Sequence, residues 1–359
     1  MRLRDGLSFV ARGRRAALLA ATVALIFVVL TACGGTDDEV PASGPGRLEV
    51  LCTVEESWCR VMVAAFEAET GIATSYERLG SGDALAALRA SKGSPKYSVW
   101  WGGPADGYVA AKAEGLLERY VAANATSVPA ASKDAEGAWT GVYVGALSFC
   151  SNRAELARLG LAAPGSWQEL LSPALKGRIS IAHPSSSGTA YTALWTVMTL
   201  NRFDEGVTFA YLGALNANVG EYTRSGAAPA SIAGRGDAAV AVVFAHDCAM
   251  AIDGGAKDLV ISFPREGTGY ETGATALLAG APNPEAGKKW VDWVLGAEAQ
   301  ELGAGAKAFQ IPMNPDAKAP ALSVKLGSLA LVDYDFTKAG QQRQALTSRF
   351  EREVAPPPR

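Results

Sequence analysis

The chain has 359 residues, 49% of them hydrophobic, and a formal net charge of −3. This length and apolar content are enough to bury a large core in two domains. The mildly acidic balance argues against nucleic acid as a partner.

The first 33 residues have the organisation of a secretory leader. Five arginines between positions 2 and 15 precede an apolar run over 16–30, which is shorter than the roughly 20 residues of a membrane span. The run ends in Leu30-Thr31-Ala32-Cys33, which resembles a bacterial lipobox. We therefore predict a lipoprotein signal peptide over 1–32, cleavage before Cys33 and a lipid on its sulfur, with a short transmembrane anchor as the alternative.

This processing would export the protein and anchor it to the cell membrane, at the cell surface or the periplasmic face. Residues 33–46 would then be the lipidated cysteine and a flexible tether, because they are small, polar and interrupted by Pro41 and Pro45. Loss of five Arg and one Asp would take the net charge of the mature chain to −7.

Four cysteines remain beyond the tether: Cys52, Cys59, Cys150 and Cys248. An even number in an exported protein predicts two disulfides, and three pairings are possible. We favour Cys52 with Cys59, which would join a loop to the helix after it, and Cys150 with Cys248. A metal site is the alternative, but the chain has only two histidines and no Cys-x-x-Cys pair.

Short apolar strands then alternate with helices along the chain. The predicted strands are 48–51, 73–76, 98–101, 178–182 and 238–245. This alternation predicts an α/β fold with a parallel or mixed sheet covered by helices on both faces. Two further extended apolar segments, 139–150 and 259–280, are candidates for connections between domains.

Several loops after these strands are rich in glycine and hydroxyl residues. They are Gly80-Ser81-Gly82, Gly102-Gly103, Ser187-Gly188-Thr189 and Thr223-Arg224-Ser225-Gly226. Any one of them is explained by ordinary helix capping. Several at one sheet edge, where open α/β sheets bind ligands, offer backbone amides, hydroxyls and one cation, Arg224, to an anion.

The stretch from His183 to Trp195, HPSSSGTAYTALW, is the strongest of these signals. Tyr191, Leu194, Trp195 and Met198 have the i, i+3, i+4, i+7 spacing of a buried helical face, so Ser187-Gly188-Thr189 would be at the start of a helix. Unpaired N–H groups and the positive end of the helix dipole favour an anion there.

His246 and Asp247 end an apolar strand and form a second candidate wall. The structural interpretation is a buried strand-end histidine followed by a capping aspartate. The functional interpretation is a pair that reaches a ligand with Glu271 beside it, since an imidazole and carboxylates suit the hydroxyls of a sugar-like molecule.

A phosphate-ester hydrolase is the alternative from another class. The chain has no Gly-x-Ser-x-Gly elbow and no His-x-x-x-His set. Its glycine-rich loops match neither a Walker A motif nor a dinucleotide fingerprint. We therefore predict a binding protein, without catalytic residues or a cofactor.

Segments 48–59, 98–118, 183–194, 221–247 and 266–295 resemble the extracellular solute-binding proteins of ABC importers, in the branch named after ferric-ion-binding proteins. The resemblance runs from about 48 to 315. It implies the type II periplasmic-binding-protein fold, two α/β lobes joined by a strand hinge. We expect lobe 1 over 47–145 plus 270–315, and lobe 2 over 146–269 plus 316–359.

The resemblance also indicates two kinds of ligand. Iron-binding members use two adjacent tyrosines, but here Tyr222 is followed by Thr223. In this alternative, Tyr222 and Glu55 would be the ligands of a ferric ion. A synergistic anion would then lie at the Ser187-Gly188-Thr189 loop. Other members resemble receptors for phosphorylated sugars or phosphonates, whose pattern is matched by Ser187, Gly188, Thr189, His246, Asp247 and Glu271.

Our prediction is therefore a monomeric, lipid-anchored receptor that captures a small anionic solute, a phosphorylated sugar or a phosphonate, between two lobes and delivers it to a membrane permease. The phosphate would lie on Ser187, Gly188 and Thr189. Ser81, Thr223, Arg224 and Ser225 would help to hold it. His246, Asp247 and Glu271 would select the rest of the solute, on which Trp101 would stack, and Tyr222 is the remaining candidate ligand residue.

Overall fold

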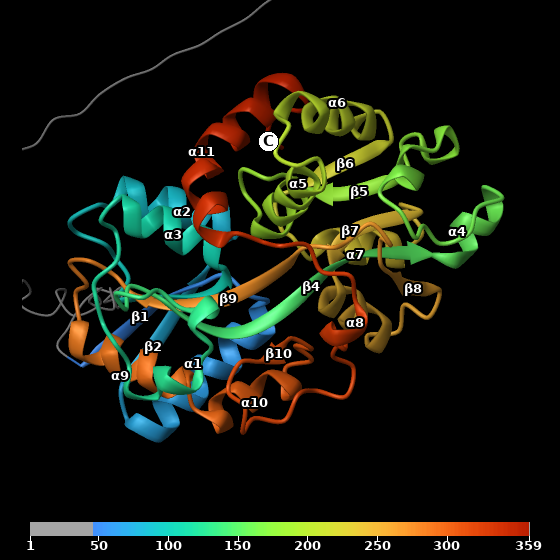
Figure 1. Ribbon diagram of the computed structural model, residues 1–359. Helices are drawn as coiled ribbons and strands as arrows, with labels where there is room; N and C mark the ends of the chain where they lie inside the picture. Colours follow the sequence, from blue (N-terminus) through green and yellow to red (C-terminus); the bar gives the residue numbers. More distant parts are fainter. Residues whose placement is uncertain (1–45, 359) are drawn as a thin grey trace, which may run out of the picture. The chain divides into compact units, whose positions relative to one another are not determined.

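A continuous mixed sheet runs through residues 46–358, the part of the chain that the structure describes (Figure 1). The computed structural model orders its strands β2-β1-β3-β9-β4-β7-β5-β6, and β10 and β8 both pair with β4. The predicted signal peptide, the lipidation site Cys33 and the tether up to residue 45 lie outside the described residues.

One half of the sheet combines the first three strands of the chain with its last two described strands. Its strands are β1 (Arg47–Cys52), β2 (Ala73–Arg78), β3 (Val99–Pro104), β9 (Tyr270–Leu277) and β10 (Ile311–Pro312). β1 pairs in parallel with β2 and β3, and β3 pairs antiparallel with β9. The helices α1 (Glu56–Thr70), α2 (Ser81–Ala90) and α3 (Ala105–Ala113) each follow one of the parallel strands.

The other half repeats this arrangement. Its strands are β5 (Ile179–Ala182), β6 (Val219–Thr223), β7 (Val240–Phe244) and β8 (Leu259–Ser262). β5 pairs in parallel with β6 and β7. The helices α5 (Gly188–Leu200), α7 (Ala228–Gly234) and α8 (Ala245–Asp253) follow these strands. All five residues of β7 are buried, as expected of a central strand with both faces covered.

Strand β4 (Thr140–Asn152) belongs to both halves. Its first part pairs with β9 and β10, and its second part, from Leu147, pairs with β7 and β8. The predicted connecting segments 139–150 and 259–280 contain β4, β8 and β9. The α/β class and the mixed sheet are thus confirmed, while the lobe boundaries stay a prediction.

The remaining helices cover the outside of the sheet. They are α4 (Arg153–Arg158), α6 (Glu205–Asn216), α9 (Pro284–Val294), α10 (Ala297–Gly305) and α11 (Phe336–Glu353). The C-terminal α11 packs on α3 and also on α5 and α6 (Figure 1). Within residues 46–358, no helix is both long and apolar enough to span a bilayer.

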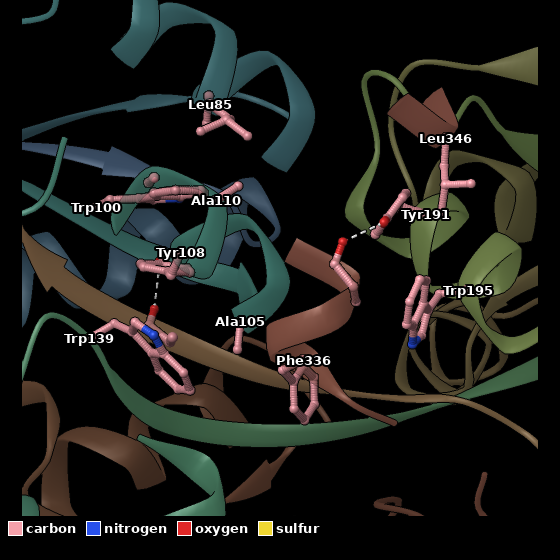
Figure 2. Close-up of a cluster of buried hydrophobic side chains, with 14 of the residues drawn as sticks. Leu85, Trp100, Ala105, Tyr108, Ala110, Trp139, Tyr191, Trp195, Phe336 and Leu346 are labelled. Carbon is pink, nitrogen blue, oxygen red and sulfur yellow. Dashed lines mark hydrogen bonds between the residues drawn. The ribbon is translucent and has the colours of Figure 1, made fainter. Parts of the chain in front are cut away.

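A buried aromatic cluster joins elements from both halves (Figure 2). Trp100 of β3 stacks on Tyr108 of α3 with ring centroids 4.0 Å apart. Tyr191 and Trp195 of α5 belong to the same cluster and are fully buried. The periodic apolar face predicted from the sequence is therefore part of the core, although α5 is buried on nearly all sides.

Two disulfides are present, with the favoured pairing. Cys52–Cys59 joins the end of β1 to α1 across seven residues, and Cys150–Cys248 joins β4 to α8 across 98 residues. The second bridge therefore closes a much longer loop of the unfolded chain.

We expect removal of Cys150–Cys248 by the double Cys→Ala substitution to lower the free energy of unfolding more than removal of Cys52–Cys59. Loop-closure entropy gives a loss of about 5 kcal/mol for the longer loop and about 2 kcal/mol for the shorter one. All four sulfurs are buried, so the two double variants are matched in burial. Urea unfolding of the two double variants would measure the difference. Equal losses of unfolding free energy would contradict the explanation by loop-closure entropy.

Candidate functional site

A cavity lies where the ends of strands from both halves of the sheet meet. It is lined by residues that follow β1, β2 and β3 and by residues that follow β5, β6 and β7. Its empty volume is about 440 Å³, the opening to solvent included. The location agrees with the rule that open α/β sheets bind ligands at the carboxyl ends of their strands.

One wall of the cavity is made of helix starts with small polar residues. Ser81 is the first residue of α2, and Ser187 is the N-cap of α5, with its Oγ accepting a hydrogen bond from the Ala190 amide at 3.3 Å. Gly188 and Thr189 form the first turn of α5 beside it. The wall therefore offers hydroxyls and the N–H groups of helix starts to an anion.

Glycine is required where this wall is tightest. A Cβ on Gly188 would lie 2.6 Å from Cδ of Pro104, and a Cβ on Gly226 would lie 2.1 Å from Oγ1 of Thr189. Any larger residue would push the backbone of these loops apart. The small residues that the sequence shows here therefore serve close packing as well as access to backbone amides.

The cation that lines the cavity is Arg78, the last residue of β2. Its Nε donates a hydrogen bond to the Val54 carbonyl at 3.0 Å, and its Nη2 lies 3.4 Å from Oε1 of Glu55 and 3.5 Å from Oγ of Ser225. Arg78 was not among the ligand-binding residues predicted from the sequence. Its signal was its position at a strand end, two residues before the Gly80-Ser81-Gly82 loop.

Another part of the cavity lining, which we call the acidic wall, is formed by His246, Asp247 and Glu271. His246 and Asp247 lie in the first turn of α8, and Glu271 lies on β9; all three side chains are buried. Nε2 of His246 is 3.6 Å from Oδ1 of Asp247 and 3.8 Å from Oε1 of Glu271, too far for hydrogen bonds. Among the described residues, Nδ1 of His246 has no hydrogen-bond partner. These groups retain capacity to bind hydroxyl or ammonium groups of a ligand.

Burial determines the charge of this wall. Desolvation lowers the pKa of His246 to about 3, so its imidazole is neutral at pH 7. Desolvation raises the pKa of both Asp247 and Glu271 well above the usual carboxyl range, with neighbouring carboxylates adding to the shift. The pKa of Glu55 is raised by burial too, although Arg78 acts in the opposite direction.

Further aromatic and polar residues also line the cavity. The Tyr143 hydroxyl accepts a hydrogen bond from the Gly103 amide at 2.9 Å, and Oγ1 of Thr53 donates to the Gly102 carbonyl at 2.6 Å. Burial raises the pKa of Tyr143 far above its ordinary value, so the phenol stays protonated. Thr53, Tyr143 and Gln310, which also line the cavity, carried no distinctive sequence signal.

The structure brings seven of the twelve predicted ligand-binding residues together around this cavity. They are Ser81, Ser187, Gly188, Thr189, His246, Asp247 and Glu271. The other five, Trp101, Tyr222, Thr223, Arg224 and Ser225, do not line it.

Each of these five residues has another environment. Trp101 is buried between Trp58 and Trp290. Tyr222 donates a hydrogen bond to Oδ1 of Asn216 at 3.0 Å. Oγ1 of Thr223 donates to the Ser225 carbonyl, and Ser225 lines an adjoining surface groove. Arg224 is more than half exposed and pairs with Asp83 at 2.8 Å.

The groups named for ferric ion are not brought together either. Glu55 lines the cavity, whereas Tyr222 packs against His183 and Phe350 in a separate apolar pocket. Over residues 46–358, no group of three or more His, Cys, Asp or Glu side chains is placed to hold a metal ion.

Comparison with known proteins identifies the class. The model of a family described as bacterial extracellular solute-binding protein matches residues 61–328. A Haemophilus influenzae "Uncharacterized protein" is 38% identical over 324 residues, 87% of this chain and 92% of that protein. A Salmonella typhimurium "Putative 2-aminoethylphosphonate-binding periplasmic protein" is 31% identical over 278 residues, 72% of this chain and 78% of that protein. The chain belongs to the bacterial extracellular solute-binding proteins, the receptors of ABC importers.

Solved structures agree with this assignment. The periplasmic binding protein AfuA of Actinobacillus pleuropneumoniae, with fructose 6-phosphate bound, superposes with a TM-score of 0.83 at 37% identity, covering 87% of this chain and 99% of that one. The periplasmic binding protein P5PA superposes with a TM-score of 0.82 at 32% identity, covering 86% of this chain and 99% of that one. Apo ferric ion-binding protein A of Pasteurella haemolytica, at 16% identity and a TM-score of 0.72, shares the fold. The predicted type II periplasmic-binding-protein fold is confirmed.

We expect the buried His246 to make the protein less stable as the pH falls from 7 to 5. The pKa of His246 is depressed in the folded state, so only the unfolded chain takes up this proton, and stability is lost as pH falls below about 6.5. The loss from this group between pH 7 and pH 5 is about 2 kcal/mol. Urea unfolding at both pH values would measure it.

His246→Gln is the matched variant, since it keeps a polar side chain but cannot titrate. Asp247 and Glu271 titrate in both proteins, and their raised pKa values shift stability in the opposite direction, so the difference between the two proteins isolates His246. The same pH dependence in both proteins would contradict a neutral buried imidazole.

Proposed function

We propose that this protein captures a small solute carrying a phosphate or phosphonate group and delivers it to the permease of an ABC importer. The observation that carries the proposal is that two helix starts and Arg78 line one cavity together with the buried His246, Asp247 and Glu271. Helix starts, hydroxyls and a guanidinium are the groups with which proteins bind phosphate.

The phosphate would be held by Ser81, Ser187, Thr189 and Arg78, together with amides at the start of α5. The rest of the solute would then extend toward His246, Asp247 and Glu271. A sugar phosphate suits this arrangement because its hydroxyls can both donate and accept hydrogen bonds. The fructose 6-phosphate of AfuA and the 2-aminoethylphosphonate in the name of the Salmonella relative both combine a phosphorus oxyanion with a second polar group.

Binding, without chemical conversion, is the proposed role. A solute held by residues that follow β2 and β5 contacts both predicted lobes, 47–145 plus 270–315 and 146–269 plus 316–359. Because a ligand shifts an equilibrium only through its differential affinity, such bridging contacts would favour the closed arrangement of the lobes. The permease would then recognise the closed receptor, which we propose to be a monomer.

We expect Arg78→Met to weaken binding of fructose 6-phosphate by about 30- to 150-fold, the loss of a charge-assisted bond of 2–3 kcal/mol. Thr189→Val, which removes a hydroxyl at the same wall, should weaken it by about tenfold. Isothermal titration calorimetry would measure both, starting from a wild-type affinity near micromolar, about −8 kcal/mol.

Arg224→Met is the matched control, since Arg224 lies outside the cavity and pairs with Asp83. Its affinity should stay within a few-fold of wild type. Equal losses in Arg78→Met and Arg224→Met would remove the distinction between the two cations. Native mass spectrometry of gently released protein would identify a captured solute by its added mass; iron with a small anion would contradict the phosphate assignment.

The proposed lipid anchor has its own test. Wild-type protein expressed with its leader should enter the detergent phase of a Triton X-114 partition, because a diacylated cysteine is strongly apolar. Cys33→Ser should move it to the aqueous phase or leave the leader attached, which intact-mass measurement would detect. An intact mass of the wild-type protein that lacks the added lipid would exclude lipidation of Cys33.

A further inference from the structure

The C-terminal helix α11 carries a buried cation that no role in solute binding explains. The side chain of Arg343 is 4% exposed and forms an ion pair with the fully buried Asp106 of α3. The Tyr334 hydroxyl donates a hydrogen bond to the other oxygen of Asp106 at 3.2 Å. Burying such a pair costs desolvation energy, and well-packed apolar residues would often be as stable. The pair therefore calls for a reason other than stability.

Asp106 lies in the first turn of α3, two residues after Pro104, which lines the cavity together with Gly103. Helix α11 approaches this turn closely, since a Cβ on Gly340 would lie 2.6 Å from the Asp106 carbonyl oxygen. The bond between Arg343 and Asp106 thus holds the start of α3 against α11.

The same guanidinium contacts the start of α5. Its central carbon lies 4.4 Å from the ring centroid of Tyr191, within cation–π range. The Tyr191 hydroxyl also donates a hydrogen bond to the Ala339 carbonyl of α11 at 2.6 Å (Figure 2). Tyr191 follows Thr189 by two residues, so α11 is fixed to the turn that forms the anion wall.

We propose that Arg343 is a positioning residue for the solute cavity, because it fixes the starts of α3 and α5 relative to each other. These two starts touch directly, since a Cβ on Gly188 would lie 2.6 Å from Cδ of Pro104. A small change in their spacing would move the backbone amides and hydroxyls that face the solute. The expected effect of Arg343 on solute affinity rests on the proposed function. Its expected effect on the positions of the two helix starts does not.

Hydrogen–deuterium exchange of the ligand-free protein tests this geometry. In Arg343→Met, amides of the segments 105–113 and 188–195 should exchange at least about tenfold faster, while those of β7 stay as in wild type. Arg343→Lys keeps the charge but not the planar guanidinium, so its amide exchange rates in these segments should lie between those of wild type and Arg343→Met. Unchanged exchange in both segments would overturn the proposal, as would an equal increase in β7, which marks general destabilisation.

Arg349→Met is the matched control on the same helix. Arg349 also pairs with carboxylates, Glu205 and Glu353, and stacks on an aromatic ring, Phe209 at 4.1 Å, but its partners lie on α6 and α11 away from the cavity. It should leave exchange at both helix starts unchanged. An equal effect of both variants would reduce Arg343 to one packing contact among several.

Affinity for fructose 6-phosphate gives a second measurement. Calorimetry should show at least about tenfold weaker binding to Arg343→Met and unchanged binding to Arg349→Met. Faster exchange with unchanged affinity would overturn the positioning role. If wild type binds no fructose 6-phosphate, the proposed sugar-phosphate function fails, whereas the exchange experiment still decides whether Arg343 fixes the two helix starts.

Discussion

The constraint on which the rest of the structure depends is that one strand, β4, is shared by the two halves of the sheet. Its residues pair with β9 as far as Ala146 and with β7 from Leu147 onward. Hydrogen bonding through one strand fixes the registers of both halves, which places Gly145 opposite Glu271 and beside the imidazole of His246. The acidic wall is therefore assembled beside this junction from two elements, α8 and β9.

The electrostatics of the cavity follow from how deeply these groups are buried. An anionic solute would be repelled by three ionised carboxylates facing a single guanidinium. Burial raises the pKa of Asp247 and Glu271, which favours their protonated forms, and leaves His246 neutral. A neutral imidazole does not repel a phosphate, and a raised carboxyl pKa reduces the repulsion that Asp247 and Glu271 would exert on it. Under the proposed function, the helix starts and Arg78 would bind the charge of the solute, and the acidic wall would bind its polar, uncharged groups.

The core and the site are continuous. Trp100, Tyr108 and Tyr191 belong to one buried cluster, and the cavity residues Gly103, Pro104 and Thr189 lie within a few residues of them. Because close-packed interiors deform little, a change in the packing of α11 reaches the helix starts that face the solute. The last described helix of the chain thereby influences loops that the sequence places some 150 and 240 residues earlier.

The sequence by itself determined the α/β alternation and the small-residue loops after the strands, because periodicity, capping and turn chemistry act over a few residues. It left three cysteine pairings open, and the one that we favoured is present in the structure. Only the tertiary structure decided which polar side chains share a cavity. Arg78 and Arg224 both lie at or just beyond strand ends, but Arg78 ends β2 beside Glu55, while Arg224 lies beyond the end of β6 and pairs outward with Asp83. Thr53 and Tyr143 gave no local signal. Which way such residues point depends on register and on packing between distant segments, which no local pattern encodes.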